Sequence, residues 1–150
     1  MPGQARRGTG LLMAGSSDWA GKQAPSLADF EQLAAVAWRR LPKDFRDMCG
    51  SVVIRVEDFP TDDVLRTMQL QSAFDLMGLF HGVSLDKRSV MEPVSMPNMV
   101  FLYRRPMLDY WAEYPETLGD LITHVLVHEI GHHFGLSDAD IALIEASAGE

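Results

Sequence analysis

The chain has 150 residues, a net charge of −8 and a single cysteine, Cys49. This length predicts one domain with enough chain to bury a core. The acidic balance argues against nucleic acid as a partner, because the phosphate backbone attracts basic surfaces. A single cysteine excludes a disulfide within the chain, and we expect Cys49 to be a small buried side chain in a protein of a reducing compartment.

Residues 1–25 are rich in Gly, Ala, Ser, Arg and Gln without any period, which predicts a flexible tail. The apolar patch Leu11–Ala14 is shorter than the core of a signal peptide, which needs about 7–15 residues. No stretch is long enough to span a membrane. We therefore expect a cytoplasmic protein with no membrane contact, whose one domain covers residues 26–150.

The spacing of apolar residues and the positions of Gly and Pro predict both helices and strands after residue 25. In chain order these are helices over 27–41 and 43–48, a strand over 51–56, a helix over 61–68, strands or extended segments over 76–85 and 99–104, a helix over 107–113, a long helix opened by Pro115, and a last helix starting at Ser137 or Asp138. This order predicts the α+β class, with a small mixed sheet packed against the helices.

Some boundaries are predicted in more detail. Ser26 is a suitable N-cap for the first helix, with Asp29 three residues later. The β-branched run 51–56 is expected to be the central strand. Pro106 is expected to stop the strand over 99–104, and a loop is expected over residues 86–98.

The run His128-Glu129-Ile130-Gly131-His132 places two histidines four residues apart. On a helix, residues i and i+4 stack on one face, so both imidazoles can reach one metal ion. Glu129 is turned by about 100° from His128, so it can lie over the open coordination position and take a proton from a metal-activated water. The motif predicts His128 and His132 as ligands of one zinc ion and Glu129 as the general base.

Gly135 and Asp138 extend the motif. Gly135 is placed to end the helix in the left-handed conformation, after which the chain turns back. Asp138 can then offer a carboxylate as the third ligand, which leaves the fourth position to water, as in catalytic zinc sites. Asp140 and Glu145 are alternatives, and Asp138 is favoured because Gly135 and a ligand three residues later make one coherent turn.

The helix that carries the motif is predicted to be largely buried, with both ligand histidines facing the protein or a cleft and Glu129 at the margin of that face. The face comprises Leu118, Leu121, Val125, His128 and His132. The residues expected on the opposite side are Asp120, His124 and Gly131. His133 is expected to be packed and hydrogen-bonded. His81 is expected to be an exposed or hydrogen-bonded strand residue.

The segment HEIGHHFGLSD resembles the motif of the zincin metallopeptidases, with Asp138 where metzincins carry a third histidine. The likeness is to the small, single-domain bacterial zincin-like metallopeptidases and covers about residues 26–147. The segments 78–83 and 100–107 also look like theirs.

The resemblance implies a minimal zincin-like fold, with a small mixed sheet over an active-site helix. It implies one zinc ion per chain on the same three ligands, and Glu129 as the catalytic base. It also implies an edge strand beside the substrate cleft, which is taken here as residues 99–104 and would pair with an extended peptide.

The sequence departs from the metzincins after the third ligand. Twelve residues follow Asp138 and none is methionine, so the methionine turn and the lower half of the cleft are expected to be absent or reduced. No downstream histidine or tyrosine is available to stabilise an oxyanion. The candidates elsewhere in the chain are Tyr103, Tyr110, Tyr114 and His124.

Together these features predict a zinc-dependent metallopeptidase that acts on a peptide or protein substrate, and a monomer is assumed. The reduced lower cleft motivates one alternative, a metal-containing module that binds peptides or proteins, or regulates them, with little or no turnover. Hydrolysis of a non-peptide amide is a third reading. A buried helix with merely hydrogen-bonded histidines is the structural alternative, and it leaves Glu129, Gly135 and Asp138 unexplained.

Overall fold

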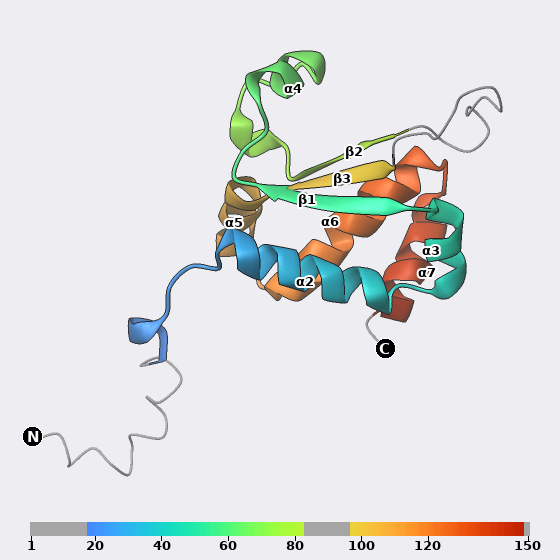
Figure 1. Ribbon diagram of the computed structural model, residues 1–150. Helices are drawn as coiled ribbons and strands as arrows, with labels where there is room; N and C mark the ends of the chain where they lie inside the picture. Colours follow the sequence, from blue (N-terminus) through green and yellow to red (C-terminus); the bar gives the residue numbers. More distant parts are fainter. Residues whose placement is uncertain (1–17, 83–96, 149–150) are drawn as a thin grey trace, which may run out of the picture.

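The computed structural model describes residues 18–82 and 97–148. The elements in chain order are η2 (Trp19–Gly21), α2 (Leu27–Arg40), α3 (Lys43–Cys49), β1 (Val52–Glu57), α4 (Asp62–Thr67), η3 (Ala73–Asp75), β2 (Gly78–His81), β3 (Asn98–Tyr103), α5 (Arg104–Glu113), α6 (Leu118–His133) and α7 (Asp138–Ala148). The three strands form one layer, and α2 and α6 pack beneath it (Figure 1). The predicted α+β class is confirmed.

The sheet has the strand order β1-β3-β2, so β3 is its central strand. β1 pairs with β3 in parallel, and β2 pairs with β3 in the antiparallel direction. The prediction that residues 51–56 form the central strand is therefore wrong, and so is the edge position expected for 99–104. Val53 and Arg55 on β1 are exposed while their neighbours are at least half-buried, as on a strand that is covered on one face.

The N-terminal helices form as predicted. Ser26 and Asp29 make a reciprocal capping box, in which the Asp29 N–H donates to Ser26 Oγ and the Ser26 N–H donates to Asp29 Oδ2. The buried face of α2 packs against β1 and α6. After α3 the chain enters β1 through Gly50, whose φ of 69° is a conformation that glycine adopts without steric cost.

Two helix starts differ from the prediction. Pro106 does not stop β3, because the strand already ends at Tyr103 and Pro106 lies in the first turn of α5, where no N–H is needed for helix bonds. The long helix α6 is not opened by Pro115. It begins at Leu118, because the side chain of Thr117 accepts a hydrogen bond from the Asp120 N–H and caps the helix.

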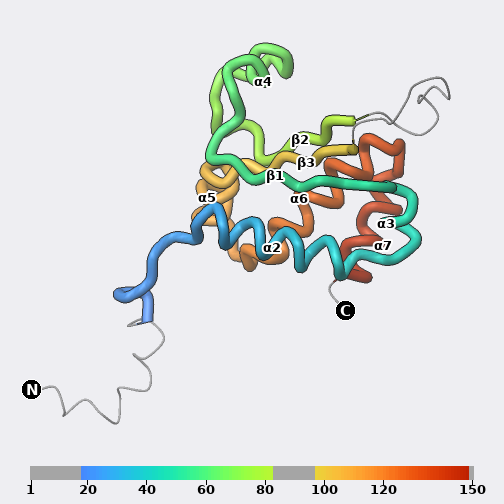
Figure 2. The backbone as a smooth tube through the Cα atoms, viewed as in Figure 1, coloured from blue at the N-terminus to red at the C-terminus, as the bar shows by residue number. Residues whose placement is uncertain are grey.

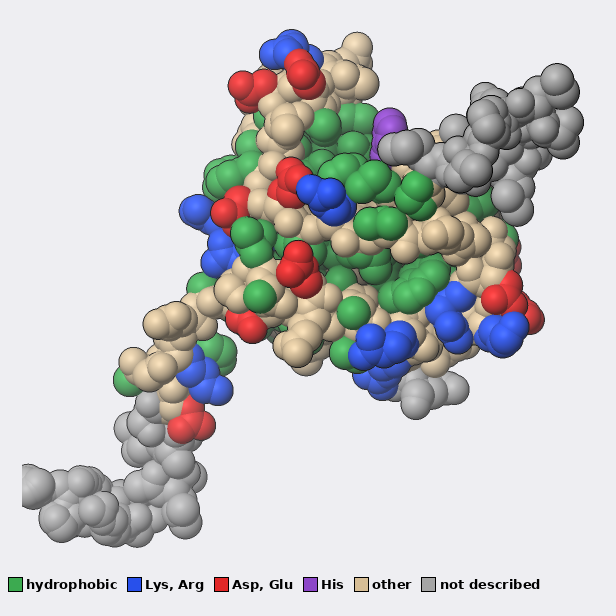
Figure 3. All heavy atoms as spheres, in the orientation of Figure 1, with side chains coloured by type: hydrophobic (Ala, Val, Ile, Leu, Met, Phe, Trp, Pro, Cys, Tyr) green, Lys and Arg blue, Asp and Glu red, His purple; other side chains and the backbone are tan. Residues whose placement is uncertain are grey.

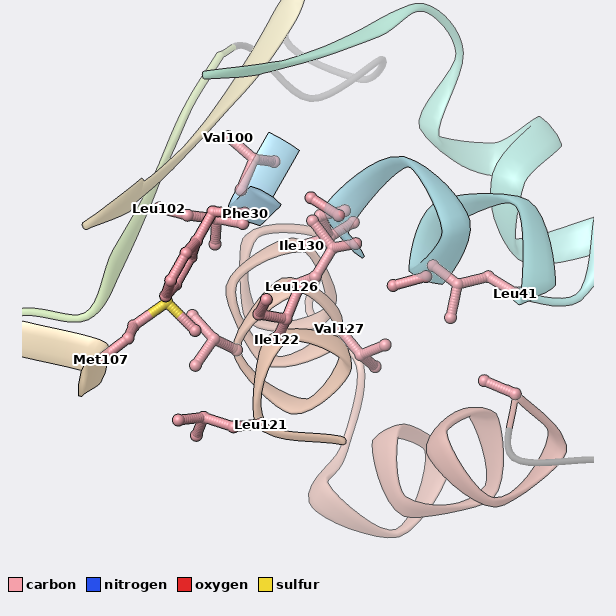
Figure 4. Close-up of a cluster of buried hydrophobic side chains, with 14 of the residues drawn as sticks. Phe30, Leu41, Val100, Leu102, Met107, Leu121, Ile122, Leu126, Val127 and Ile130 are labelled. Atoms are coloured by element: carbon pink, nitrogen blue, oxygen red, sulfur yellow. The ribbon is translucent and has the colours of Figure 1, made fainter. Parts of the chain in front are cut away.

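The core lies between the sheet and the helices. Figure 4 shows Phe30 of α2 and Leu102 of β3 beside Ile122 and Leu126 of α6, and all four are fully buried. Met107 of α5 closes one end of this cluster. The core thus fixes α6 under the sheet, which confirms that the helix carrying the motif is largely buried.

The remaining predictions concern the N-terminal segment, the loop before β3 and the surface of the molecule. Residues 1–17 and the loop residues 86–96 lie outside the described residues, and the exposed turn Trp19–Gly21 precedes α2. Among the described helices, none has the length and apolar character needed to cross a membrane. In the space-filling view, hydrophobic side chains gather over the sheet, with acidic and basic ones distributed around them (Figure 3).

Candidate metal centre

Three histidines form a row along one side of α6. His124, His128 and His132 are spaced by four residues, and their ring centroids are 3.9 Å and 5.6 Å apart in sequence order. The prediction that His124 faces the opposite side from His128 is wrong. Four residues advance about 400° around a helix, so each histidine is displaced by only about 40° from the previous one.

Gly131, which is also predicted on the side opposite His128, is instead only about 60° from His128 around the helix. Gly131 is buried, and a Cβ built there would lie 2.7 Å from Cγ1 of Ile141. The missing side chain lets α7 approach α6 closely, and the chain path in Figure 2 shows α7 returning after the turn that ends α6. This close approach brings carboxylates of α7 to the row of histidines.

The turn between the two helices is built as predicted around Gly135, whose φ is 77°. The Leu136 N–H donates to the carbonyl of Gly131, and the Gly135 N–H donates to that of His132. These two bonds are the Schellman pattern that satisfies the last carbonyls of a helix. Ser137 then caps α7 by accepting a bond from the Asp140 N–H, which leaves Asp138 in the first helical turn.

Asp138 faces the end of the histidine row. Its Oδ1 lies 3.9 Å from Nε2 of His132, and its side chain is 90% exposed. The structure therefore brings together the second histidine of the motif and the predicted third ligand. It does so through the short turn, because only five residues separate these two side chains.

Glu129 lies on the sheet side of the histidine row, against the edge strand β2. A Cβ at Gly78 of β2 would lie 3.4 Å from Cγ of Glu129, so this glycine makes room for the glutamate side chain. Burial raises the pKa of Glu129 above its usual range, whereas the charge of His132 and a hydrogen bond from the Phe80 backbone act in the other direction. The motif glutamate is thus partly desolvated next to a strand edge.

His128 is turned toward α7. Its Nε2 lies 3.7 Å from Oε2 of Glu145, and Nδ1 of His124 lies 2.6 Å from Oε1 of the same carboxylate. Burial and the neighbouring His124 lower the pKa of His128, against the opposing effect of Glu145. One ligand atom each from His124, His128 and Glu145 lie within 4.8 Å of one another, which makes these three a group that could hold a metal ion.

This second grouping was only partly visible in the sequence. The sequence offers Glu145 as an alternative to Asp138, and His124 as a candidate oxyanion stabiliser. For the two histidines, the signal in the sequence is their spacing at i and i+4. The contact with Glu145 depends on how α7 packs, and no local pattern reports that.

The other residues singled out in the sequence have the following surroundings. His133 stacks on the ring of Phe80, with the ring centroids 4.0 Å apart, which fits the expected packed histidine. His81 is exposed at the end of β2. Cys49 is buried, and its Sγ donates to the carbonyl of Phe45. Tyr103 is also buried, and burial together with the carboxylates of Glu57 and Glu129 raises its pKa to about 12.

The donor chemistry fits a zinc ion. Two imidazoles on one helix face and a carboxylate from the next helix are ligand types that zinc prefers, and both His132 and Asp138 are accessible from solvent. With these three as ligands, one coordination position is left for water. The donor types therefore fit the metal that the motif predicts, although the structure does not bring one ligand atom each of His128, His132 and Asp138 within 4.8 Å of one another.

Comparison with known proteins gives an independent result. The zincin-like metallopeptidase family matches residues 49–148, which is two thirds of the chain and includes the sheet, α6 and α7. No curated protein matches the chain. The family match agrees with the resemblance carried by HEIGHHFGLSD and with the fold, although it does not extend over α2. The chain therefore belongs to the zincin-like metallopeptidase family.

Proposed function

We propose that this protein is a zinc-dependent metallopeptidase that holds one zinc ion with His128, His132 and Asp138. The observation that carries the proposal is the arrangement on α6. The two histidines of the motif share one side of the helix, and Glu129 lies beside them, partly buried against the edge strand. Asp138 of the next helix supports the proposal, because its Oδ1 lies 3.9 Å from Nε2 of His132.

A bound zinc ion would supply a Lewis acid that polarises the scissile carbonyl and lowers the pKa of water to about 7. Glu129 then acts as the general base. Its carboxylate accepts a proton from the attacking water and passes that proton to the leaving amine. Because burial raises the pKa of Glu129, its carboxyl group holds a proton more firmly than an exposed glutamate does, which suits it to this transfer.

The substrate we propose is a peptide or protein in extended conformation, bound along β2. β2 is at the edge of the sheet and packs against α6, so it borders the helix that carries Glu129. An edge strand offers main-chain groups to which an extended peptide can pair. This replaces the strand over 99–104 that the sequence suggested for the role, since β3 is paired on both sides.

The test is Glu129→Gln in the full chain, with zinc measured by elemental analysis and hydrolysis measured by mass spectrometry on a peptide library. The variant is expected to keep about one zinc per chain and to lose hydrolysis by roughly 10²–10⁴-fold, the usual contribution of a general base. Glu113→Gln, at an exposed position of α5, is the matched control and should leave both unchanged. Undiminished hydrolysis by a zinc-loaded Glu129→Gln protein would exclude Glu129 as the general base.

A metal-containing binding module is the second candidate. The observation that favours it is the openness of the centre, since His132 is 57% exposed and Asp138 is 90% exposed. Catalysis gains from a site that excludes water, whereas capture of a peptide by a metal ion and a strand edge does not need that exclusion. This candidate predicts that the wild-type protein binds library peptides without cleaving them. Cleavage that disappears in Glu129→Gln would count against it.

A further inference from the structure

The group of His124, His128 and Glu145 shares His128 with the site described above, and the proposed function does not use its other two members. Glu145 of α7 places its two carboxylate oxygens toward the two histidines, at 2.6 Å from Nδ1 of His124 and 3.7 Å from Nε2 of His128. Among the described residues, no other group of three His, Cys, Asp or Glu side chains brings its ligand atoms within 4.8 Å of one another.

The spacing of these atoms is close to what a metal ion requires. Zinc binds imidazole nitrogen and carboxylate oxygen at about 2.0–2.2 Å, so two ligands in a tetrahedral site are roughly 3.4 Å apart. Side-chain rotations that move these ligand atoms by about an ångström would therefore close the group around an ion. Two imidazoles and one carboxylate also match the donors that bind Zn²⁺, Co²⁺ and Ni²⁺.

The group is also accessible. The side chain of His124 is 48% exposed, and that of Glu145 is 25% exposed. Both border a cavity of about 620 Å³ between α2 and the α6–α7 pair, whose lining includes the acidic side chains of Glu116 and Asp120 as well as Arg40. An ion can thus reach the group from solvent without any opening of the core.

The position of Glu129 separates this group from the catalytic one. Around α6, His124 lies about 40° to one side of His128, whereas His132 and Glu129 lie about 40° and 100° to the other side. Glu129 accepts a hydrogen bond from the Phe80 backbone at the edge of β2, on the side of α6 away from His124. An ion at this group has no general base from the motif.

We propose that His124, His128 and Glu145 form a second divalent-cation site, which competes with the His128–His132–Asp138 site for the imidazole of His128. The competition follows because one Nε2 lone pair binds one ion at a time, and this Nε2 faces Glu145 in the structure. Occupation of the second site removes a ligand from the catalytic site. The site itself stands on its own geometry, and only its inhibitory effect rests on the proposed function.

The binding test uses the full chain, freed of metal by a chelator and titrated with Zn²⁺ in a calorimeter. In His132→Ala/Asp138→Ala, which removes the proposed catalytic ligands, we expect one ion per chain to bind still. Adding Glu145→Gln to that background should weaken binding at least about tenfold, because a carboxylate ligand is lost. Asp140→Asn removes an exposed acid of the same helix, is the matched control and should leave binding unchanged.

Two results would overturn the site. One is a folded His132→Ala/Asp138→Ala protein that binds no Zn²⁺, and the other is binding that Glu145→Gln does not weaken. Circular dichroism checks folding, and His124→Gln on the same background replaces Glu145→Gln if that chain fails to fold. Two ions bound with equal affinity by the wild-type chain would overturn the sharing of His128.

The inhibitory effect is tested separately with any peptide that the wild-type protein cleaves. Excess Zn²⁺ is expected to slow hydrolysis by the wild-type chain and to slow it less in Glu145→Gln. Equal inhibition of both proteins would overturn the regulatory part of the proposal. Because the binding test needs no substrate, failure of the second site and failure of the peptidase proposal give different results.

Discussion

Asp138 and Glu145 are both acids of α7 that face a histidine of α6, but their surroundings differ. Asp138 lies in the first turn of its helix, is almost fully exposed, and has one histidine neighbour. Glu145 is mostly buried between two histidines. At the scale of single residues, the proposals above assign the exposed Asp138 to the catalytic site and the less exposed Glu145 to the His124–His128–Glu145 group.

Asp138→Asn is expected to lower zinc affinity at least about tenfold, because the amide that replaces the carboxylate carries no charge for the metal. The affinity that remains should be that of the His124–His128–Glu145 group. Competition with a chromogenic chelator measures both values. Asp140→Asn removes the same charge from the same helix turn and should have little effect. Equal affinities for Asp138→Asn and the wild-type chain would exclude Asp138 as a ligand.

Cys49 offers a second prediction at this scale. Burial raises the pKa of its thiol from 9.0 to about 12. The thiolate is the reactive form, and at pH 8 its population is then about a thousandfold smaller than for an unburied thiol. We expect a disulfide reagent to leave the native protein unlabelled on the timescale of minutes and to label one thiol per chain in guanidinium chloride. Rapid labelling of the native protein would show that α3 opens readily.

At the scale of elements, the centre depends on how closely α6 and α7 approach. The contact is made by Gly131, and the turn that follows is fixed by Gly135. The edge strand β2 contributes in the same way, since Gly78 lets it lie against Val125 and Glu129. Glycines thus set the distances between the elements that carry the site, while His and carboxylate residues supply its chemistry.

Gly131→Ala is expected to destabilise the protein by about 1–3 kcal/mol, because the new Cβ would overlap the buried side chain of Ile141 and push α7 outward. Gly119→Ala is the matched control in the same helix. Nothing lies within 4 Å of a Cβ there, so the change should stabilise by about 0.4–1 kcal/mol. Urea denaturation measures both free energies of unfolding, and equal effects would show that the contact at Gly131 is not tight.

At the scale of the whole molecule, the start of the domain is tied to its interior. Arg104, which opens α5, donates from Nε to the carbonyl of Pro25 at 2.6 Å and forms an ion pair with Asp58. Together with the capping box of Ser26, this contact fastens the N-terminal end of α2 to the end of the sheet. Residues 25 and 26 therefore belong to the domain.

Shortening the chain tests this boundary. A protein that begins at Gly21 keeps these contacts and should unfold at the same denaturant concentration as the full chain. A protein that begins at Leu27 loses the cap and the Pro25 carbonyl, which together cost about 2–3 kcal/mol. If the protein that begins at Gly21 were already destabilised by that amount, part of the residues 1–20 would be needed for the fold.

The sequence by itself determined the local features of this protein. The capping box at Ser26, the end of α6 at Gly135 and the motif from His128 to Asp138 depend on residues within one or two helical turns, so their spacing is sufficient to predict them. The α+β class followed from the same periodicities. The family resemblance followed from the motif and is confirmed by the match over residues 49–148.

Only the tertiary structure decided which strand is central and which carboxylate meets which histidine. β1 and β3 are both β-branched or apolar runs, and local composition does not reveal that β3 is paired on both sides while β2 is the edge beside Glu129. Glu145 meets His124 and His128 because Gly131 lets α7 pack along α6. Contacts between elements arise from the packing of buried surfaces, and that packing is a property of the whole chain.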